Sequence, residues 1–267
     1  MAKHTDMERK AMNSKSRGFT LVEMAIVLVI IGIILAGVMK GRDIVRGSQV
    51  KQFSQQFAQK WATIAQTYYD KTGQLLLDSS ANGATSETNP PDGTMDGGLA
   101  TDIGDVEDVL EKVGITPCTL IKSKLTSTVA ITGLDGVAVH CSSDGTAANM
   151  KVNVVQTTVE GEYAGTRVVQ AELGTVLISL GGKTLRRNLV ILYNVPPDVA
   201  QGLDTAIDGK ADGESGSCIG LGDAYAVDTP AASIPAGFPH ASTSEPATAW
   251  ADASQTQCQT VGIILDY

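Results

Sequence analysis

The chain has 267 residues, of which 43% are hydrophobic and 18% charged, so it can bury a core and is not a wholly disordered protein. A net charge of -9 and an aromatic content of 4% argue against a surface for nucleic acid, and no nucleic-acid partner is expected. The charge is unevenly distributed, because residues 1–60 are basic and residues 61–267 are strongly acidic.

An apolar segment follows the basic N-terminus. Residues 19–39 contain one ionisable side chain, Glu23, and the 16 residues from Met24 to Met39 are all apolar or glycine. At 1.5 Å per residue, this segment spans about 31 Å as a helix, roughly the thickness of the bilayer core. It ends in Gly37-Val38-Met39-Lys40, without the A-x-A-like site of a secretory signal peptide. The pattern predicts a single-pass transmembrane helix with a cytoplasmic N-terminus and an exported acidic body.

The start of this segment carries a specific motif. The stretch Arg17-Gly18-Phe19-Thr20-Leu21-Val22-Glu23-Met24 resembles the type III signal of type IV prepilins and type II secretion pseudopilins. The resemblance implies that a membrane-embedded aspartyl peptidase, the prepilin peptidase, cuts between Gly18 and Phe19 and methylates the new N-terminal Phe19. Residues 1–18 are then a leader peptide. Met7 and Met12 are alternative starts, and neither changes the mature chain.

Glu23 lies inside the apolar segment, where a carboxylate is costly unless it is paired. No basic residue lies three or four positions away from it. The resemblance implies that it pairs with the free amino group of Phe19 on a neighbouring subunit, which would set the register of a filament. A carboxylate that merely reaches the headgroup level is the alternative.

The helix is predicted to continue well beyond the membrane. From Val50, apolar residues recur at spacings of 3, 4, 4, 3 and 4 up to Tyr68. Gly73 is a residue typical of the position just beyond the C-terminus of a helix. A helix over residues 19–72 would be roughly 80 Å long and resembles the long N-terminal helix of pilins. The proline that many type IVa major pilins carry in this helix is absent, since the first proline is Pro90.

Residues 73–267 are predicted to form the exported globular head. Long loops are expected at 78–105 and 208–257, and short helices at 106–113 and 199–207. The pair Arg186-Arg187 is interpreted as the solvated start of a strand. The predicted fold class is α+β and pilin-like: a long N-terminal spine helix, half in the membrane (19–39) and half amphipathic, packed on an antiparallel sheet with large loops. The predicted strands are 127–132, 137–140, 151–159, 166–172, 175–180, 188–193 and 261–265.

Four cysteines lie in the exported body, where the environment is oxidising, and three pairings are possible. The sequential pairing, Cys118–Cys141 and Cys218–Cys258, is favoured because the second bridge resembles the disulfide-bounded C-terminal region of many pilins. A zinc site is not expected, since no C-x-x-C motif is present.

A calcium site is a minor alternative to a metal-free chain. Some pseudopilins bind Ca²⁺ in C-terminal loops, and four acidic residues could supply oxygen ligands here. These residues are Asp204, Asp208, Asp212 and Glu214.

No catalytic or nucleotide-binding motif accompanies these features, so neither an enzyme nor a cofactor is expected. The favoured function is a structural subunit of a type IV pilus-like filament, either minor or unusually large, and a type II secretion pseudopilin is the alternative. A membrane-anchored exported enzyme or ligand-binding protein is the alternative of another class. Expected partners are other pilin or pseudopilin subunits, the prepilin peptidase, an inner-membrane assembly platform protein and, before assembly, membrane lipid. The chain would move from the inner membrane to an extracellular or periplasmic filament.

Overall fold

The structure is a computed structural model that describes residues 20–84, 90–95, 97–99, 102–124, 154–221 and 244–266. The chain divides into two units, Met1–Arg46 and Gly47–Tyr267. The described part of the first unit is the N-terminal part of one long helix, and the second unit contains the rest of that helix and the head.

The predicted long helix is confirmed. It consists of α1 (Leu21–Phe53), a π-helical turn η1 (Ser54–Ala58) and α2 (Gln59–Thr72). It ends at Gly73, which adopts the left-handed conformation with φ +70° and donates its N–H to the carbonyl of Tyr69 at 2.7 Å. Glycine adopts this conformation without a steric penalty, and it is therefore the common residue just beyond a helix.

The π turn was not predicted, although the sequence explains why it suits the helix. Phe53, Phe57 and Trp61 are spaced by four residues twice in succession, which drifts around a regular helix of 3.6 residues per turn. A π turn takes up one additional residue, shown here by the Gln59 N–H that donates to the carbonyl of Ser54, five residues back. The Gln59 side chain also donates to the Ser54 hydroxyl at 2.9 Å. All three aromatic side chains are thereby buried.

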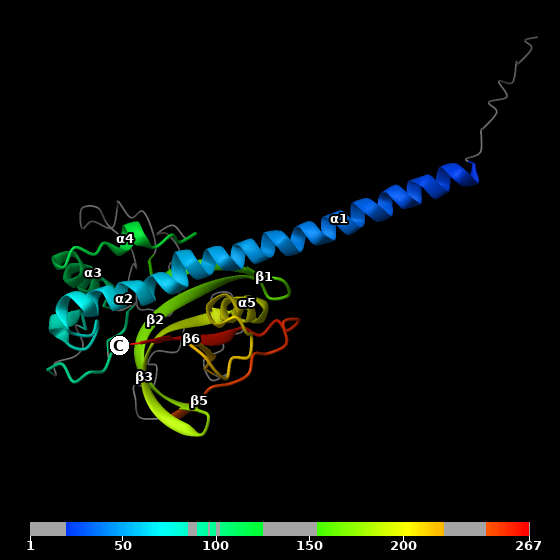
Figure 1. Cartoon of the computed structure of the whole chain (residues 1–267). Coiled ribbons are helices and arrows are strands. Elements are labelled where there is room, and N and C mark those ends of the chain that lie inside the picture. The colour runs from blue at the N-terminus through cyan, green and yellow to red at the C-terminus, as the bar shows by residue number, and fades with distance from the viewer. Residues whose placement is uncertain are drawn as a thin grey trace, which may run out of the picture. The chain divides into compact units, whose positions relative to one another are not determined.

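The head contains an antiparallel sheet with the strand order β1-β2-β3-β6-β4 (Figure 1). A short sixth strand, β5, pairs with β2 in parallel over three residues. The long hairpin of β2 and β3 forms the centre of the sheet. The strands are β1 (Gln156–Gly161), β2 (Gly165–Leu180), β3 (Lys183–Val195), β4 (Cys218–Gly220), β5 (Ser244–Pro246) and β6 (Gln259–Leu265).

Five of the predicted strands overlap four observed ones, β1, β2, β3 and β6, with two corrections. The predicted strands 166–172 and 175–180 form the single strand β2, because the Ile191 side chain of β3 covers Gly174 and no turn interrupts the pairing there. The short strands β4 and β5 were missed. The predicted strands 127–132 and 137–140 lie outside the described residues.

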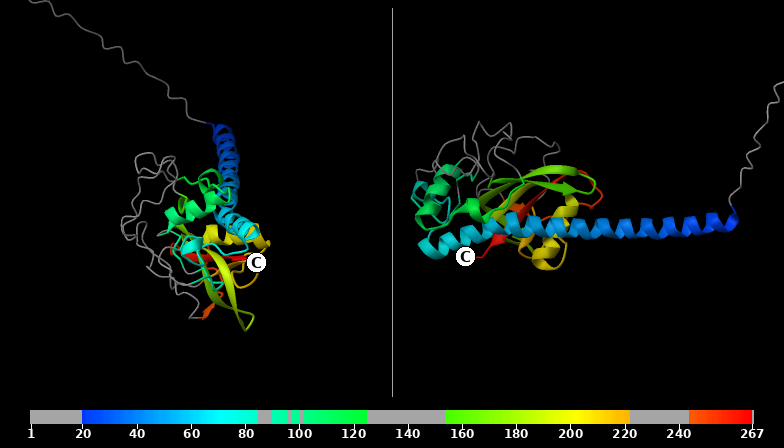
Figure 2. Two further views of the ribbon diagram at one scale, coloured as in Figure 1. Left: turned by 90° about the vertical axis from the view of Figure 1, so that its left-hand side faces the viewer. Right: turned by 90° about the horizontal axis from the view of Figure 1, so that it is seen from above.

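Short helices surround the sheet (Figures 1 and 2). The two predicted helices correspond to α3 (Ile103–Lys112) and α5 (Pro197–Asp208), while α4 (Pro117–Leu120) and the 3-10 turn η2 (Ser80–Asn82) were not predicted. Proline occupies the first position of α5, where its missing N–H costs no helical hydrogen bond.

The main core lies between the second half of the spine helix and one face of the sheet. Trp61 is 0% exposed, and its indole N–H donates to the carbonyl of Val154 at 2.9 Å. Gly202 of α5 lies against Val50, and a β-carbon at Gly202 would be 2.8 Å from a Val50 methyl group. A second, smaller core covers the other face of the sheet and includes alternate residues of β3. The predicted arrangement of a spine helix packed on an antiparallel sheet is therefore confirmed.

Candidate functional site

The beginning of α1 is a capping box built from Thr20 and Glu23. The Glu23 carboxylate accepts hydrogen bonds from the Thr20 backbone N–H and hydroxyl, both at 2.8 Å. The Thr20 hydroxyl in turn accepts the Glu23 N–H at 3.3 Å. This reciprocal arrangement satisfies two N–H groups that the first helical turn leaves without intrahelical partners. The T-x-x-E spacing of residues 20–23 indicates such a box, which was not among the predicted features.

The helix beyond this box exposes a continuous apolar surface. Large apolar side chains are more than 40% exposed along the segment, with values of 87% for Leu21 and 70% for Met39. A helix of this length and composition is long and apolar enough to cross a membrane. Exposed apolar surface of this extent is not stable in water, so the segment must be covered by lipid or by other protein.

Two predicted site residues, Gly18 and Phe19, lie outside the described residues. Cleavage and methylation at these positions stay predictions. The structure places Glu23 on the first turn of α1 and shows that it interacts with its own helix. The pairing of Glu23 with a neighbouring subunit stays a prediction as well.

The predicted Cys218–Cys258 disulfide is absent, because both residues are buried thiols. Cys218 lies opposite Ile263 in the β4–β6 pair, and Cys258 lies five residues before Ile263. At about 3.4 Å per residue, the two cysteines are separated by about 17 Å along the strand. A disulfide requires α-carbons within about 7 Å. The strand register therefore excludes this bridge.

The other predicted bridge is only partly within the described structure. Cys118 lies on α4, with its sulfur 3.5 Å from a carboxylate oxygen of Glu107. Cys118 is disulfide-bonded, and its predicted partner, Cys141, lies outside the described residues, so the identity of the partner stays a prediction.

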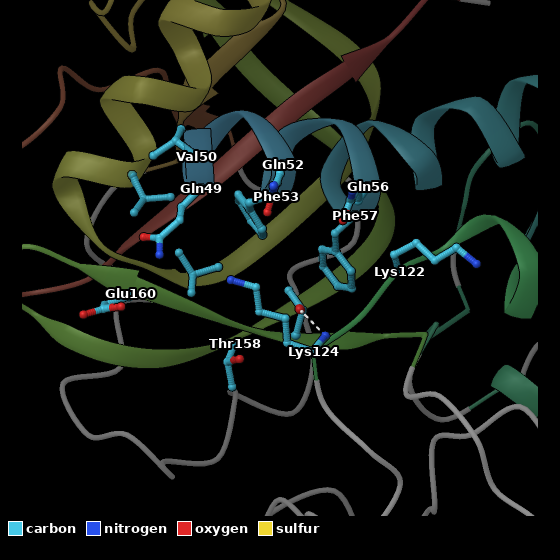
Figure 3. A pocket seen from close by; sticks show the side chains of 13 residues that line it. Gln49, Val50, Gln52, Phe53, Gln56, Phe57, Lys122, Lys124, Thr158 and Glu160 are labelled. Carbon is cyan, nitrogen blue, oxygen red and sulfur yellow. Dashed lines mark hydrogen bonds between the residues drawn. The ribbon is translucent and has the colours of Figure 1, made fainter. Parts of the chain in front are cut away.

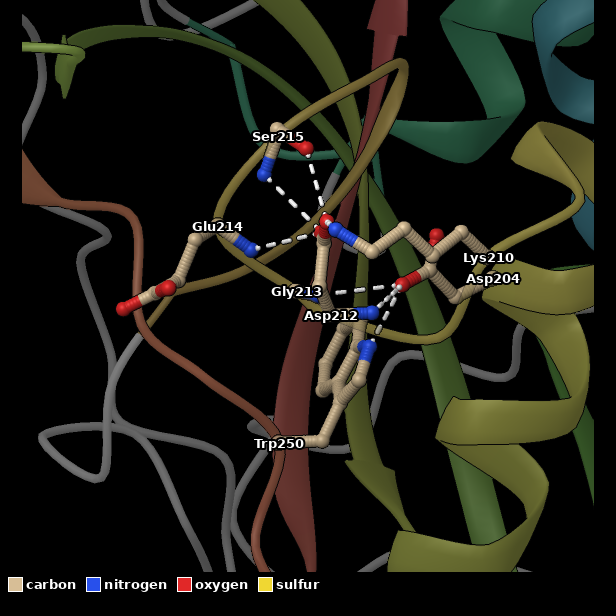
Figure 4. A network of polar contacts seen from close by, with 7 residues as sticks. All are labelled: Asp204, Lys210, Asp212, Gly213, Glu214, Ser215 and Trp250. Atoms are coloured by element: carbon tan, nitrogen blue, oxygen red, sulfur yellow. Dashed lines mark hydrogen bonds and ion pairs between the residues drawn. The ribbon is translucent and has the colours of Figure 1, made fainter.

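Figure 4 shows three of the four acidic residues considered for calcium, Asp204, Asp212 and Glu214, and the Glu214 side chain points away from the other two. One Asp204 oxygen accepts the N–H groups of Asp212 and Gly213 at 3.0 and 3.1 Å, and the indole N–H of Trp250 at 2.6 Å. Donor hydrogens therefore surround this oxygen, while the other Asp204 oxygen is buried without a hydrogen-bond partner among the described residues. Asp212 instead forms an ion pair with Lys210 at 2.7 Å. Within the described ranges no group of three His, Cys, Asp or Glu side chains could hold a metal ion.

The Asp204 carboxylate organises the loop between α5 and β4. It is completely buried, and its partners come from the loop and from the segment that carries Trp250. Burial raises the pKa of Asp204 and the nearby Asp208 carboxyl acts in the same direction, while the Trp250 and backbone hydrogen bonds lower it. Gly213 has φ +71°, and a β-carbon there would lie 2.6 Å from the Thr248 carbonyl oxygen. The hydrogen bonds of Asp204 thus stabilise a tightly packed turn, which is a structural role.

Helix α3 presents a second acidic cluster. Burial raises the pKa of Glu107 to about 7, and the nearby Glu111 and Asp108 carboxylates add to this effect. Asp108 and Glu111 are exposed on the same helix. Like charges three or four positions apart on a helix repel one another, so this face of α3 is electrostatically unfavourable in the isolated subunit.

The raised pKa of Glu107 makes the stability of the head depend on pH. Between about pH 4.5 and 7 the folded chain retains a proton that the unfolded chain has lost, so stability falls as the pH rises. We expect a loss of about 1–2 kcal/mol over this window, after allowing for solvent screening of a partly exposed carboxyl. Glu107→Gln should remove this loss. Urea unfolding of the detergent-solubilised chain at pH 5 and pH 8 measures it.

Glu160→Gln is the matched control for this experiment, because Glu160 is an exposed carboxylate on β1. This variant should keep the wild-type difference in stability between the two pH values. If Glu107→Gln also kept that difference, Glu107 would not be the group responsible.

A shallow pocket lies where the spine helix meets β1 (Figure 3). Phe53 and Phe57 form its apolar floor, and Lys122 and Lys124 line one side. The Lys124 N–H donates to the Thr157 hydroxyl at 3.2 Å, and the Lys122 N–H donates to the Gln56 carbonyl in the π turn at 3.1 Å. These bonds connect the segment after α4 to the helix and to β1. The pocket has no set of converging polar groups that would indicate a catalytic centre.

A comparison with known families finds one match. The family model described as the prokaryotic N-terminal methylation motif matches residues 13–39. This range contains Gly18, Phe19 and Glu23. No curated protein and no solved structure matches the chain. The methylation motif, together with the apolar N-terminal helix and the antiparallel head, supports assignment of the chain to the type IV pilin and pseudopilin family.

Proposed function

We propose that the chain is a structural subunit of a type IV pilus-like filament, a minor or large pilin that is inserted in the inner membrane and then assembled through its hydrophobic helix. The observation that carries this proposal is the exposed apolar surface of α1, most of which lies within the matched methylation motif. The surface suits lipid before assembly and neighbouring helices afterwards, since both environments exclude water. In this proposal the role is structural and not catalytic.

The proposal includes a defined path for the chain. The leader stays in the cytoplasm, the prepilin peptidase removes it, and an assembly platform protein of the inner membrane brings the subunit to the filament. A mature chain that begins at Phe19 would be long for a major pilin, which favours a minor or unusually large subunit. A type II secretion pseudopilin is the alternative within the family.

The first test is the N-terminus of the protein from its native host. We expect a chain that begins at Phe19 and carries one added methyl group, as measured by intact mass and N-terminal sequencing. In Gly18→Leu a branched side chain replaces the glycine before the cut, and this variant should keep its leader. A wild-type chain with an intact leader would contradict the proposal and favour a membrane-anchored enzyme or ligand-binding protein.

A second measurement distinguishes a filament on the cell surface from one confined to the cell envelope. Filaments sheared from the cell surface are compared with the periplasmic and membrane fractions by immunoblotting. A processed chain in the sheared fraction supports a pilus subunit, whereas a processed chain confined to the envelope supports a secretion pseudopilin.

A further inference from the structure

The distal part of the β2–β3 hairpin, residues 176–188, extends beyond most of the sheet; we call it the arm (Figure 1). The strand β1 pairs with β2 only as far as Gln170, and β6 pairs with β3 only from Asn188 onward. Among the described strands, none pairs with the outer edge of β3 over Lys183–Arg187. Within the described ranges, the arm therefore has an open strand edge on β3.

The arm is also the most basic exposed part of the described head. It carries Lys183, Arg186 and Arg187 and no acidic residue, although residues 61–267 are strongly acidic. All three side chains are exposed. Arg186 lies close enough to Asp92 to contribute to the lowered pKa of that carboxyl, which is due mainly to a hydrogen bond from Thr94. No described residue forms a hydrogen bond or a close ion pair with these three side chains.

Charged residues on an open strand edge can simply prevent unwanted pairing between sheets. Lysine is especially common in that role. The arm, however, carries two arginines beside its lysine and lies on a chain with a net charge of -9. A uniformly basic arm on an acidic molecule indicates attraction to an acidic surface.

The chain itself provides such a surface on α3. Asp108 and Glu111 are exposed there, and their charges already act unfavourably on Glu107. Figures 1 and 2 show α3 and the arm in different parts of the head, so the arm of one copy is not placed to cover its own α3. Two complementary surfaces at different places on one subunit are what a head-to-tail contact between identical copies requires, and repeated contacts of this kind build filaments.

We propose that the arm of one subunit docks against the exposed acidic face of α3 on a neighbouring copy of this chain. The docking places Arg186 and Arg187 near Asp108 and Glu111, and it relieves the repulsion between the carboxylates of α3. This inference rests on the proposed function as a filament subunit. It identifies the contact between heads, which the apolar helices do not provide.

The test is an exchange of charges in the full chain, expressed in the native host. Arg186→Glu/Arg187→Glu reverses the charge of these two arm residues, and Asp108→Lys/Glu111→Lys reverses the charge of the exposed acidic residues of α3. Each double variant should lower the amount of subunit in sheared filaments by about tenfold, because like charges then face each other across the interface. The quadruple variant restores opposite charges at the contact and should recover most of the wild-type amount.

A matched control reverses the charge of two exposed lysines outside the arm, Lys122→Glu/Lys124→Glu. Its change in net charge equals that of the arm variant, and it should leave incorporation within about twofold of the wild type, since surface charges away from a contact have small effects. Total protein, the processed N-terminus and the melting temperature are measured for every variant. Variants with an unchanged melting temperature and an altered filament content report on docking and not on folding.

Several results would overturn the inference. These are wild-type incorporation of the arm variant, failure of the quadruple variant to recover, or an equal loss in the control. Retention of the wild-type chain and the arm variant on a heparin column is also compared. If the arm variant is incorporated like the wild type but is no longer retained on heparin, the arm binds a polyanion and not a neighbouring subunit. Failure of the proposed function itself looks different, because the wild-type chain would then be absent from the sheared filaments.

Discussion

Trp61→Ala is expected to lower the free energy of unfolding of the head by about 3–5 kcal/mol, the usual cost of removing a large buried aromatic side chain. Trp61 is completely buried between the spine helix and the sheet, and its indole N–H donates to the Val154 carbonyl. The substitution removes the side chain that fills this space and leaves a buried carbonyl without its donor. Urea unfolding of the detergent-solubilised chain, followed by circular dichroism, measures the change.

Two further variants calibrate this result. Trp61→Phe keeps most of the volume but loses the hydrogen bond, so it should cost about 1–3 kcal/mol. Tyr163→Ala removes a side chain that is 54% exposed and should change stability by less than about 0.5 kcal/mol. A cost below about 1 kcal/mol for Trp61→Ala would mean that the spine helix is not packed on the sheet as described.

Glu23→Val is expected to produce a processed, exported chain that is largely missing from sheared filaments. In the proposed filament, the carboxylate neutralises the Phe19 amino group of a neighbouring subunit, and its loss leaves that charge unpaired among apolar helices. Before assembly the loss matters less, because the Phe19 amino group is not yet enclosed by neighbouring helices. Immunoblotting of sheared filaments beside whole-cell protein measures incorporation.

The capping box supplies a control that separates the two roles of Glu23. Thr20→Ala removes the hydroxyl that exchanges hydrogen bonds with Glu23 and leaves the carboxylate in place. If Glu23 acts between subunits, Thr20→Ala should assemble nearly as well as the wild type. If Glu23 serves only to cap its own helix, the two variants should lose incorporation to a similar degree.

Much of the architecture could be predicted because the signals are local. The period of apolar residues between Val50 and Tyr68 identified the spine helix, and Gly73 identified its end. The π turn could not be found in this way, because spacings of three and four residues suit a regular helix as well. The T-x-x-E box could have been found. Its T-x-x-E spacing is a local signal for the start of a helix.

The predictions that the structure does not support concern features that depend on distant parts of the chain. Whether Cys218 and Cys258 can meet depends on the register of β4 against β6, and nothing near either cysteine encodes that register. The same holds for Asp204, whose oxygen accepts an indole N–H from a residue 46 positions away. Composition shows that acidic residues are numerous there, but only the fold shows that N–H groups already occupy one Asp204 oxygen.

The π turn also affects how the chain tolerates changes in length. A regular α-helix that loses one residue rotates everything on one side of the deletion by about 100° relative to the other side. Within Ser54–Ala58, a deletion could instead convert the π turn into an α turn, so the helix would stay continuous. Phe53 and Trp61, which flank the turn, would then still share one face, because the α turn covers about the same rotation with one residue fewer. A deletion in this turn that spares Phe57 should therefore disturb the core less than a deletion elsewhere in the buried half of the helix, where no such conversion is available.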